Sequence, residues 1–182
     1  MKRSYIYLLL TLVFFVSCSE EKSQEKQTEK KVKKVPKVVK HTVDPASEHF
    51  SVEDILKIDK EIPLIELIVP KNWGQQELDQ LKQLELLSEA TFKGNDLSKI
   101  EIDFLTYKRT VKILRFKDCT IHNDLFKILR RTVVEKIVFQ NTALTDEVIQ
   151  SLTHAPRLKE VYTDSKLEEL KTALPKVEIK SL

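Results

Sequence analysis

Glycine is scarce in this sequence: the 182 residues include only two, Gly74 and Gly94. A loop that cradles phosphate groups needs several closely spaced glycines, so phosphate-binding loops and dinucleotide-binding fingerprints are excluded. The formal net charge of +3 is too small to indicate binding to nucleic acid. Eight Phe, four Tyr and one Trp, with many Leu, Ile and Val, are enough for a hydrophobic core and argue against wholesale disorder.

Cysteine and histidine are also few, with two Cys and four His in the chain. No two His residues have metal-ligand spacing, no Cys-x-x-Cys motif occurs, and nothing resembles a nucleophile elbow. We therefore expect no metal site, no cofactor and no enzymatic activity. Each histidine is expected to be a surface or capping residue: His41, His49, His122 and His154.

The first residues have the pattern of an export signal. Lys2 and Arg3 precede an apolar run from Tyr5 to Val16, which only Thr11 interrupts. The run is shorter than the ~20 residues that a membrane-spanning helix needs. A basic start, a short apolar run and a small residue are typical of a removable signal peptide, which we assign to 1–17.

The tetrad Phe15, Val16, Ser17 and Cys18 resembles the lipobox of bacterial lipoproteins, with Phe15 where Leu is usual. The resemblance implies that Cys18 carries acyl chains such as palmitate and holds an extracytoplasmic protein on a membrane. Ser19 in place of Asp implies the outer membrane, and the acidic residues after it resemble a signal for export to the cell surface. The alternative is an ordinary secretory signal with an incidental Cys.

A charged tether follows, over 18–43. Its 19–43 part holds eight Lys against four Glu, one Pro and no aromatic residue, a composition typical of disorder. The remainder, 44–182, holds 21 basic and 24 acidic residues and is slightly acidic. The Lys-rich part, 30–40, is either a solvated spacer or a contact with anionic lipid head groups.

The N-terminal cap, 44–63, contains a predicted short helix. Ser51 and Asp54 form a capping-box-like start, the helix runs to about Lys60, and Pro63 ends it. From Leu64 onward one apolar frame recurs every 23 or 24 residues, with apolar residues at plus three and plus five. The frames begin at Leu64, Leu87, Val111, Val134 and Leu158.

At plus eight, the frames carry Asn72, Asn95, Cys119 and Thr142, while the fifth frame departs with Lys166. This pattern resembles the leucine-rich repeat family. The resemblance implies an α/β solenoid of about five repeats over 64–182, with parallel strands on the concave face, helices on the convex face and an N-terminal capping helix. Helical second halves are expected at 75–86, 98–107, 123–131, 145–153 and 165–173, before a closing strand at 174–179.

In such a solenoid, strand residues at plus two, four and six face outward. They would form a basic centre flanked by acids and crossed by an apolar line, an arrangement typical of a protein contact patch. We expect a non-catalytic, monomeric interaction module for a protein, peptide or glycan. The alternatives are ordinary strand residues without a ligand and a structural cell-envelope protein. The expected partner contacts are Ile68, Glu89, Lys93, Ile113, Arg115, Lys117, Lys136, Val138 and Tyr162.

Overall fold

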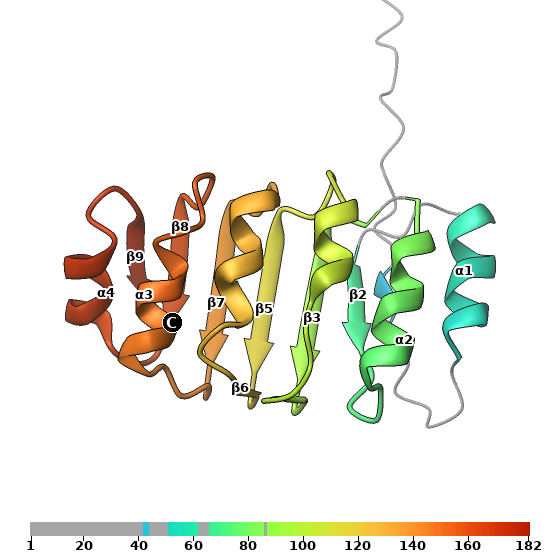
Figure 1. Ribbon diagram of the computed structural model, residues 1–182, viewed down its shortest axis with the longest axis horizontal. Coiled ribbons are helices and arrows are strands. Elements are labelled where there is room, and N and C mark those ends of the chain that lie inside the picture. Colours follow the sequence, from blue (N-terminus) through green and yellow to red (C-terminus); the bar gives the residue numbers. More distant parts are fainter. Residues whose placement is uncertain (1–41, 44–50, 62–65, 86) are drawn as a thin grey trace, which may run out of the picture. The chain divides into compact units, whose positions relative to one another are not determined.

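The computed structural model describes residues 42–43, 51–61, 66–85 and 87–182, which belong to one compact unit spanning 38–182 (Figure 1). The predicted signal peptide, Cys18 and the tether up to His41 lie outside the described residues. So do residues 44–50 and 62–65 of the predicted cap and first frame, including Leu64, where that frame begins.

The described strands form a parallel sheet of seven strands whose spatial order follows the sequence. From β2 to β8, paired residues are 23 or 24 positions apart: Leu67 pairs with Ala90, and Ala90 with Leu114. The predicted α/β class with parallel strands is confirmed. The strands are β1 (Thr42–Val43), β2 (Glu66–Val69), β3 (Glu89–Lys93), β5 (Ile113–Lys117), β7 (Lys136–Gln140), β8 (Glu160–Thr163) and β9 (Glu178–Ser181).

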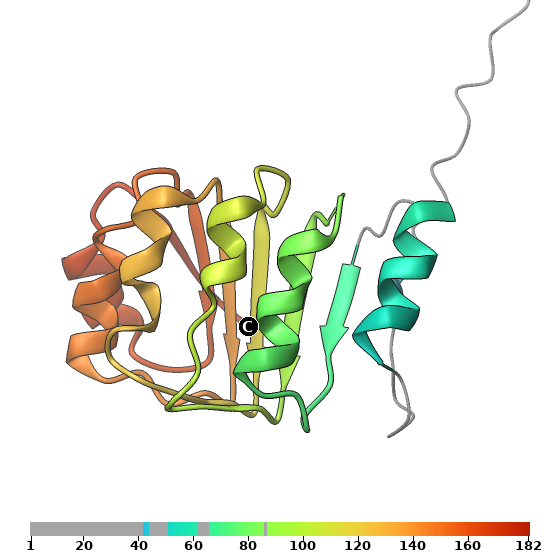
Figure 2. The same ribbon diagram turned by 45° about the vertical axis from the view of Figure 1, so that its right-hand side comes forward.

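The helical segments that follow strands β2 to β8 lie on one side of the sheet (Figures 1 and 2). They are shorter than predicted, and the two after β3 and β5 are 3-10 helices. A 3-10 helix rises ~2 Å per residue, so it spans the length of a short strand with few residues. The segments are α2 (Gln75–Gln80) with η1 (Leu81–Gln83), η2 (Asp103–Tyr107), η3 (Leu125–Arg131), α3 (Asp146–Leu152) and α4 (Leu167–Ala173).

The first helix, α1 (Val52–Glu61), lies at the N-terminal end of the sheet, beside α2 (Figure 1). Its predicted capping box is present: the Ser51 amide donates to Asp54 Oδ2 at 3.1 Å, and the Asp54 amide donates to Ser51 Oγ at 3.2 Å. Val52 and Ile55 are buried in the core. This helix therefore covers the apolar edge that the sheet would otherwise expose.

The core lies between the sheet and its helices. Side chains at plus three and plus five are buried in β2, β3, β5, β7 and β8. Phe92, Phe116 and Phe139 stack across three neighbouring strands, with ring centroids 5.3 and 5.6 Å apart. Phe126 of η3 packs edge-on against Phe116 and Phe139. This aromatic stack ties the middle of the sheet to one helical segment.

Three boundaries differ from the predictions. Thr42 and Val43, assigned to the tether, form β1 and pair with β2, because Val43 and Leu67 continue the parallel register. The closing strand begins at Glu178 instead of 174, since Leu174 ends α4. A further short ladder, β4 (Asp96–Leu97) with β6 (Thr120–Ile121), occupies residues just before the segments predicted to be helical at 98–107 and 123–131.

Candidate interaction face

Opposite the helices, the sheet has a face that no described helix covers, which we call the open face (Figure 2). Strand side chains alternate between the core and this face, so β3 and β5 show strict alternation of half-exposed and buried residues. The register aligns the outward residues in rows. The middle row runs Ile68, Thr91, Arg115, Val138, Tyr162 and Lys180.

A buried polar ladder holds the ends of three strands in place. Asn95 Nδ2 donates to the Pro70 carbonyl at 3.0 Å, and Cys119 Sγ lies 3.3 Å from the Phe92 carbonyl. Thr142 Oγ1 lies 3.3 Å from the Phe116 carbonyl and accepts from the Cys119 amide at 3.3 Å. These bonds satisfy backbone groups that would otherwise be buried without partners.

The ladder matches the predicted plus-eight positions except at Asn72, which is exposed. There the chain turns directly into α2, and the Trp73 amide bonds the Pro70 carbonyl while the Trp73 ring is buried. Cys119, at the plus-eight position of its frame, is a buried ladder residue. Burial raises the pKa of its thiol, since desolvation opposes formation of the thiolate. Its thiol is therefore a poor candidate for a reactive nucleophile.

Charged residues at the centre of the open face pair with one another across strands. Arg115 Nη2 lies 3.0 Å from Glu89 Oε2, and the Glu89 side chain is only 14% exposed. Lys136 Nζ lies 3.6 Å from Glu160 Oε2. Arg115 and Lys136, two members of the predicted basic centre, are thus neutralised within the sheet; its other members are Lys93 and Lys117.

The apolar side chains expected to form an exposed line across the open face are partly covered by their neighbours. Val138 is buried at 9% exposure, because Arg115 and Tyr162 flank it in the register. The Tyr162 ring lies between two lysines: Lys136 Nζ is 4.0 Å from the ring centroid, and Lys180 Nζ is 5.3 Å away. Lys180 Nζ also donates to the Tyr162 hydroxyl at 3.2 Å. The prediction of Val138 as an exposed contact is wrong.

Four predicted contacts keep accessible side chains, and within the described part of the chain the two lysines among them form no ion pair. Lys93 is exposed, and Ile68, Ile113 and Lys117 are half-exposed. Lys93 and Lys117 are register partners at the ends of β3 and β5. The accessible part of the open face is therefore basic at the carboxyl ends of β3 and β5, while Ile113 lies at the amino end of β5 and Ile68 lies within β2.

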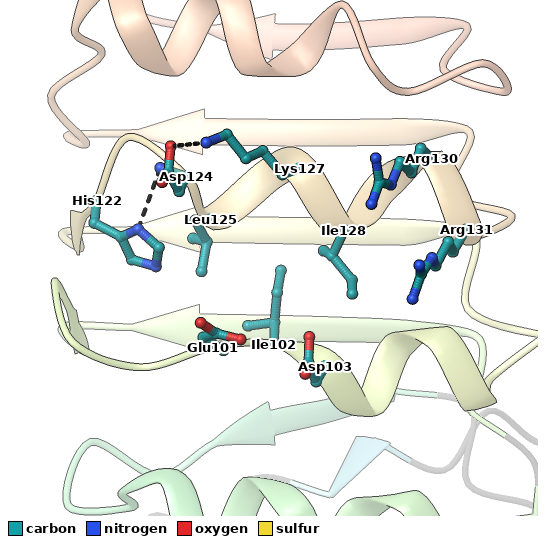
Figure 3. Close-up of a pocket in the computed structure, with 10 residues that line it drawn as sticks. All are labelled: Glu101, Ile102, Asp103, His122, Asp124, Leu125, Lys127, Ile128, Arg130 and Arg131. Carbon is teal, nitrogen blue, oxygen red and sulfur yellow. Dashed lines mark hydrogen bonds and ion pairs between the residues drawn. The ribbon is translucent and has the colours of Figure 1, made fainter.

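On the helical side, a groove of about 260 Å³ lies between η2 and η3 (Figure 3). Figure 3 shows His122 at one end, Arg130 and Arg131 at the other, and Leu125 with Ile128 between them. The sequence did not indicate this groove, because its lining comes from two segments about 20 residues apart that have no shared motif.

His122 has a structural position at the edge of this groove. Its Nδ1 accepts from the Asp124 amide at 3.2 Å, and its Nε2 lies 3.3 Å from the Ile100 carbonyl. These contacts fit a ring in which Nδ1 accepts and the Nε2 hydrogen points to the carbonyl. Both nitrogens are occupied, so His122 holds the turn before η3, in line with the expected role.

Within the described ranges, no group of three or more His, Cys, Asp or Glu side chains is arranged to hold a metal ion. None of the helices described for this chain combines the length and apolar character needed to cross a membrane. No protein-family model matches the chain, and no curated protein matches it.

Proposed function

We propose that residues 64–182 form a leucine-rich-repeat solenoid whose strand face is concave. The regular strand register of 23 or 24 residues supports this proposal. So does the polar ladder, in which Asn95, Cys119 and Thr142 use different side chains to bond the backbone of the preceding turn. The helical segments on the opposite side complete the pattern.

The chain is proposed to be a lipoprotein held on a membrane through acylated Cys18, with the outer membrane as the favoured location. The support comes from the sequence: a basic start, a short apolar run and the lipobox-like tetrad ending at Cys18. Between Cys18 and β1, the 23 residues from Ser19 to His41 would have a coil-like end-to-end distance of about 24–29 Å. The folded part would therefore stand away from the lipid surface.

The folded part is proposed to bind a protein partner through the open face, without catalysis. The observation that carries this proposal is a full sheet face left uncovered by the described helices, with fixed charges and half-exposed Ile68 and Ile113. Such a rigid surface presents side chains in set positions, which favours recognition of another surface.

A structural envelope protein without a dedicated ligand is the second candidate. The observation that favours it is the internal pairing on the same face: Arg115 with Glu89, Lys136 with Glu160, and Lys180 with Tyr162. Groups already paired contribute less to recognition, since a partner must first displace their contacts.

Site-specific cross-linking distinguishes the two candidates. A photoreactive amino acid replaces Gln140, exposed at the end of β7 on the open face, in cells that produce the protein. The matched control replaces Gln150, an exposed glutamine of α3 on the helical side. An interaction module gives a discrete cross-linked partner from position 140 and not from 150. Equal or absent products at both positions would favour the structural role.

The anchor is tested separately with Cys18→Ala. We expect this variant to lose incorporated radioactive palmitate and to leave the membrane fraction, while Cys119→Ser retains both. A Cys18→Ala protein that stays fully membrane-bound would contradict acylation at this residue.

A further inference from the structure

Two lysines stand side by side at the carboxyl end of the open face. Lys93 ends β3, Lys117 ends β5, and the two are paired in the register of these adjacent parallel strands. Neighbouring strands lie about 4.8 Å apart, so both ammonium groups project from neighbouring points on the same face. Like charges placed opposite each other oppose folding.

The other cations of the open face are each matched by an acid. Arg115 pairs with Glu89, Lys136 with Glu160, and Lys180 with Glu178 at 3.0 Å. Among the contacts of the described residues, neither Lys93 nor Lys117 has an ion pair of this kind. Their outer neighbours in the row, Pro70 and Gln140, carry no charge.

The acids nearest in sequence have other partners. Asp96 Oδ1 accepts from the Ser98 amide at 3.0 Å. Asp118 Oδ1 accepts from Asn141 Nδ2 at 3.0 Å. Both carboxylates are therefore directed along the turns that follow the strands, and they leave the two lysines available to a ligand.

A third lysine reaches the same end of the sheet. The side chain of Lys71, after β2, lies over Gly94, with its Cδ 3.6 Å and its Nζ 4.0 Å from the position a Cβ of Gly94 would take. Gly94 has φ of 70°, a left-handed turn that also brings its amide to the Lys117 carbonyl at 2.8 Å. Lys71, Lys93 and Lys117 together form what we call the basic end of the open face.

We propose that the basic end binds carboxylate side chains of an acidic peptide segment in a protein partner, with aliphatic side chains of that segment against Ile68 and Ile113. The inference rests on the proposed function and names the chemistry of its partner. An anionic membrane is the less suitable occupant, because a uniformly negative surface would also meet Glu66, Glu89, Glu160 and Glu178 on the same face. A peptide places negative charge only where the lysines lie.

The test uses the full-length chain and a random peptide library as the probe. Peptides selected by the chain are expected to be enriched in Asp and Glu, and their affinity is expected to fall as salt screens the contact. The double variant Lys93→Glu, Lys117→Glu lowers the affinity of the selected acidic peptides by about tenfold or more and selects peptides rich in Lys and Arg instead. The control Lys99→Glu, Lys176→Glu makes the same change in net charge at exposed sites off this face and retains the original selection.

The remaining outcomes of these experiments contradict one or both of the proposals. Selected peptides that bind the double variant unchanged, yet lose affinity with Ile113→Asp, overturn the basic end while leaving an open-face interaction module in place. Both proposals are overturned if binding depends on residues of the helical side. They are also overturned if no peptide is selected and position 140 gives no cross-linked partner. The assignment to a peptide is overturned if the chain binds vesicles containing phosphatidylglycerol through Lys93 and Lys117 but does not bind peptides through these residues.

Discussion

Asn95, Cys119 and Thr142 occupy equivalent places after three neighbouring strands, and each bonds a backbone carbonyl of the preceding turn. What the position requires is a small buried side chain with a polar atom, so an amide, a thiol and a hydroxyl all serve. Leaving such a buried group without a partner costs ~1–3 kcal/mol. This is why the spacing of the polar residue was informative although its identity varied.

Replacement of Thr142 tests this requirement. Thr142→Val keeps the shape of the side chain but leaves the Cys119 amide and the Phe116 carbonyl without the hydroxyl. We expect the free energy of unfolding in urea to fall by about 1–3 kcal/mol. Thr142→Ser retains the hydroxyl and should lose clearly less. Equal stability of the Val and Ser variants would contradict a role for the hydroxyl.

The same spacing placed Asn72 among the ladder positions, although Asn72 is not part of the ladder in the structure. The pattern depends on the chain turning inward after the strand, and at this place it enters α2 with Trp73 buried instead. The neighbouring sequence carries that signal only weakly, through Gly74 at the helix start, where the Gly74 amide donates to Glu77 Oε2 at 2.9 Å. A local pattern cannot specify which of two adjacent side chains enters the core.

At the scale of single strands, alternation correctly assigned which side chains face outward, but it did not predict which of them remain accessible. Tyr162 is covered by Lys136 and Lys180, which come from the strands on either side. Val138 is buried beneath its neighbours in the same row. Accessibility depends on long side chains that are 18–26 residues away in sequence, so periodicity alone does not contain it.

The lysine pair at the ends of β3 and β5 has a consequence for stability that is independent of any partner. We expect Lys117→Gln to leave the free energy of unfolding unchanged or to raise it by up to ~1 kcal/mol, because it removes repulsion from Lys93. Lys136→Gln is the matched comparison and should lower stability, since Lys136 contacts both Glu160 and the Tyr162 ring.

Urea unfolding at low and high salt checks this pair of variants. Any gain in Lys117→Gln should shrink when salt screens the repulsion. A clear loss of stability in Lys117→Gln would show that Lys117 has a stabilising contact within the chain, and would weaken the case for an external carboxylate.

For the helical segments, the sequence indicated their places but not their lengths or type. The segment at 98–107 begins its helix only at Asp103, and just before this segment Asp96 and Leu97 pair with Thr120 and Ile121 in a second ladder. The paired residues are 24 positions apart and so follow the same repeat, but strands of two residues are too short for alternation to indicate them. The region at 145–153, with Thr145 accepting from the Val148 amide at 3.2 Å, was predicted closely since its cap is local.

Considered as a whole, the described molecule has carboxylates whose pKa values are lowered in the folded state. The causes differ: hydrogen bonds from Ser51 lower the pKa of Asp54, while bonds from Lys82, Lys127 and Lys159 lower those of Asp79, Asp124 and Glu135. On the alkaline side, burial raises the pKa of Cys119, and bonds to acids raise those of Lys82 and Lys166.

These shifts predict a stability plateau around neutral pH. A lowered carboxylate pKa adds stability above its ordinary value of 3.8 or 4.5, and this is lost as the pH falls through the folded-state value. A raised thiol or ammonium pKa adds stability below its ordinary value of 9.0 or 10.5, which is lost as the pH rises.

Circular dichroism melts across this range measure the expected profile. We expect Tm to be nearly constant between about pH 5 and 8.5 and to decline on both sides. Added salt should flatten the acidic decline, because the carboxylates concerned are exposed. A Tm at pH 3 equal to that at pH 7 would contradict the contribution of these carboxylates.

In the seven-stranded sheet each inner strand pairs only with its two neighbours in the order β1, β2, β3, β5, β7, β8, β9, and we expect this order to determine how the molecule opens. Losing β9 or β1 removes one neighbour from one strand and leaves every other pairing intact. Opening of β5, in contrast, separates β3 from β7 and breaks the stack of Phe92, Phe116 and Phe139. We therefore expect amide deuterium exchange to advance from the two terminal strands inward, with the amides of Ile113–Lys117 the last to exchange.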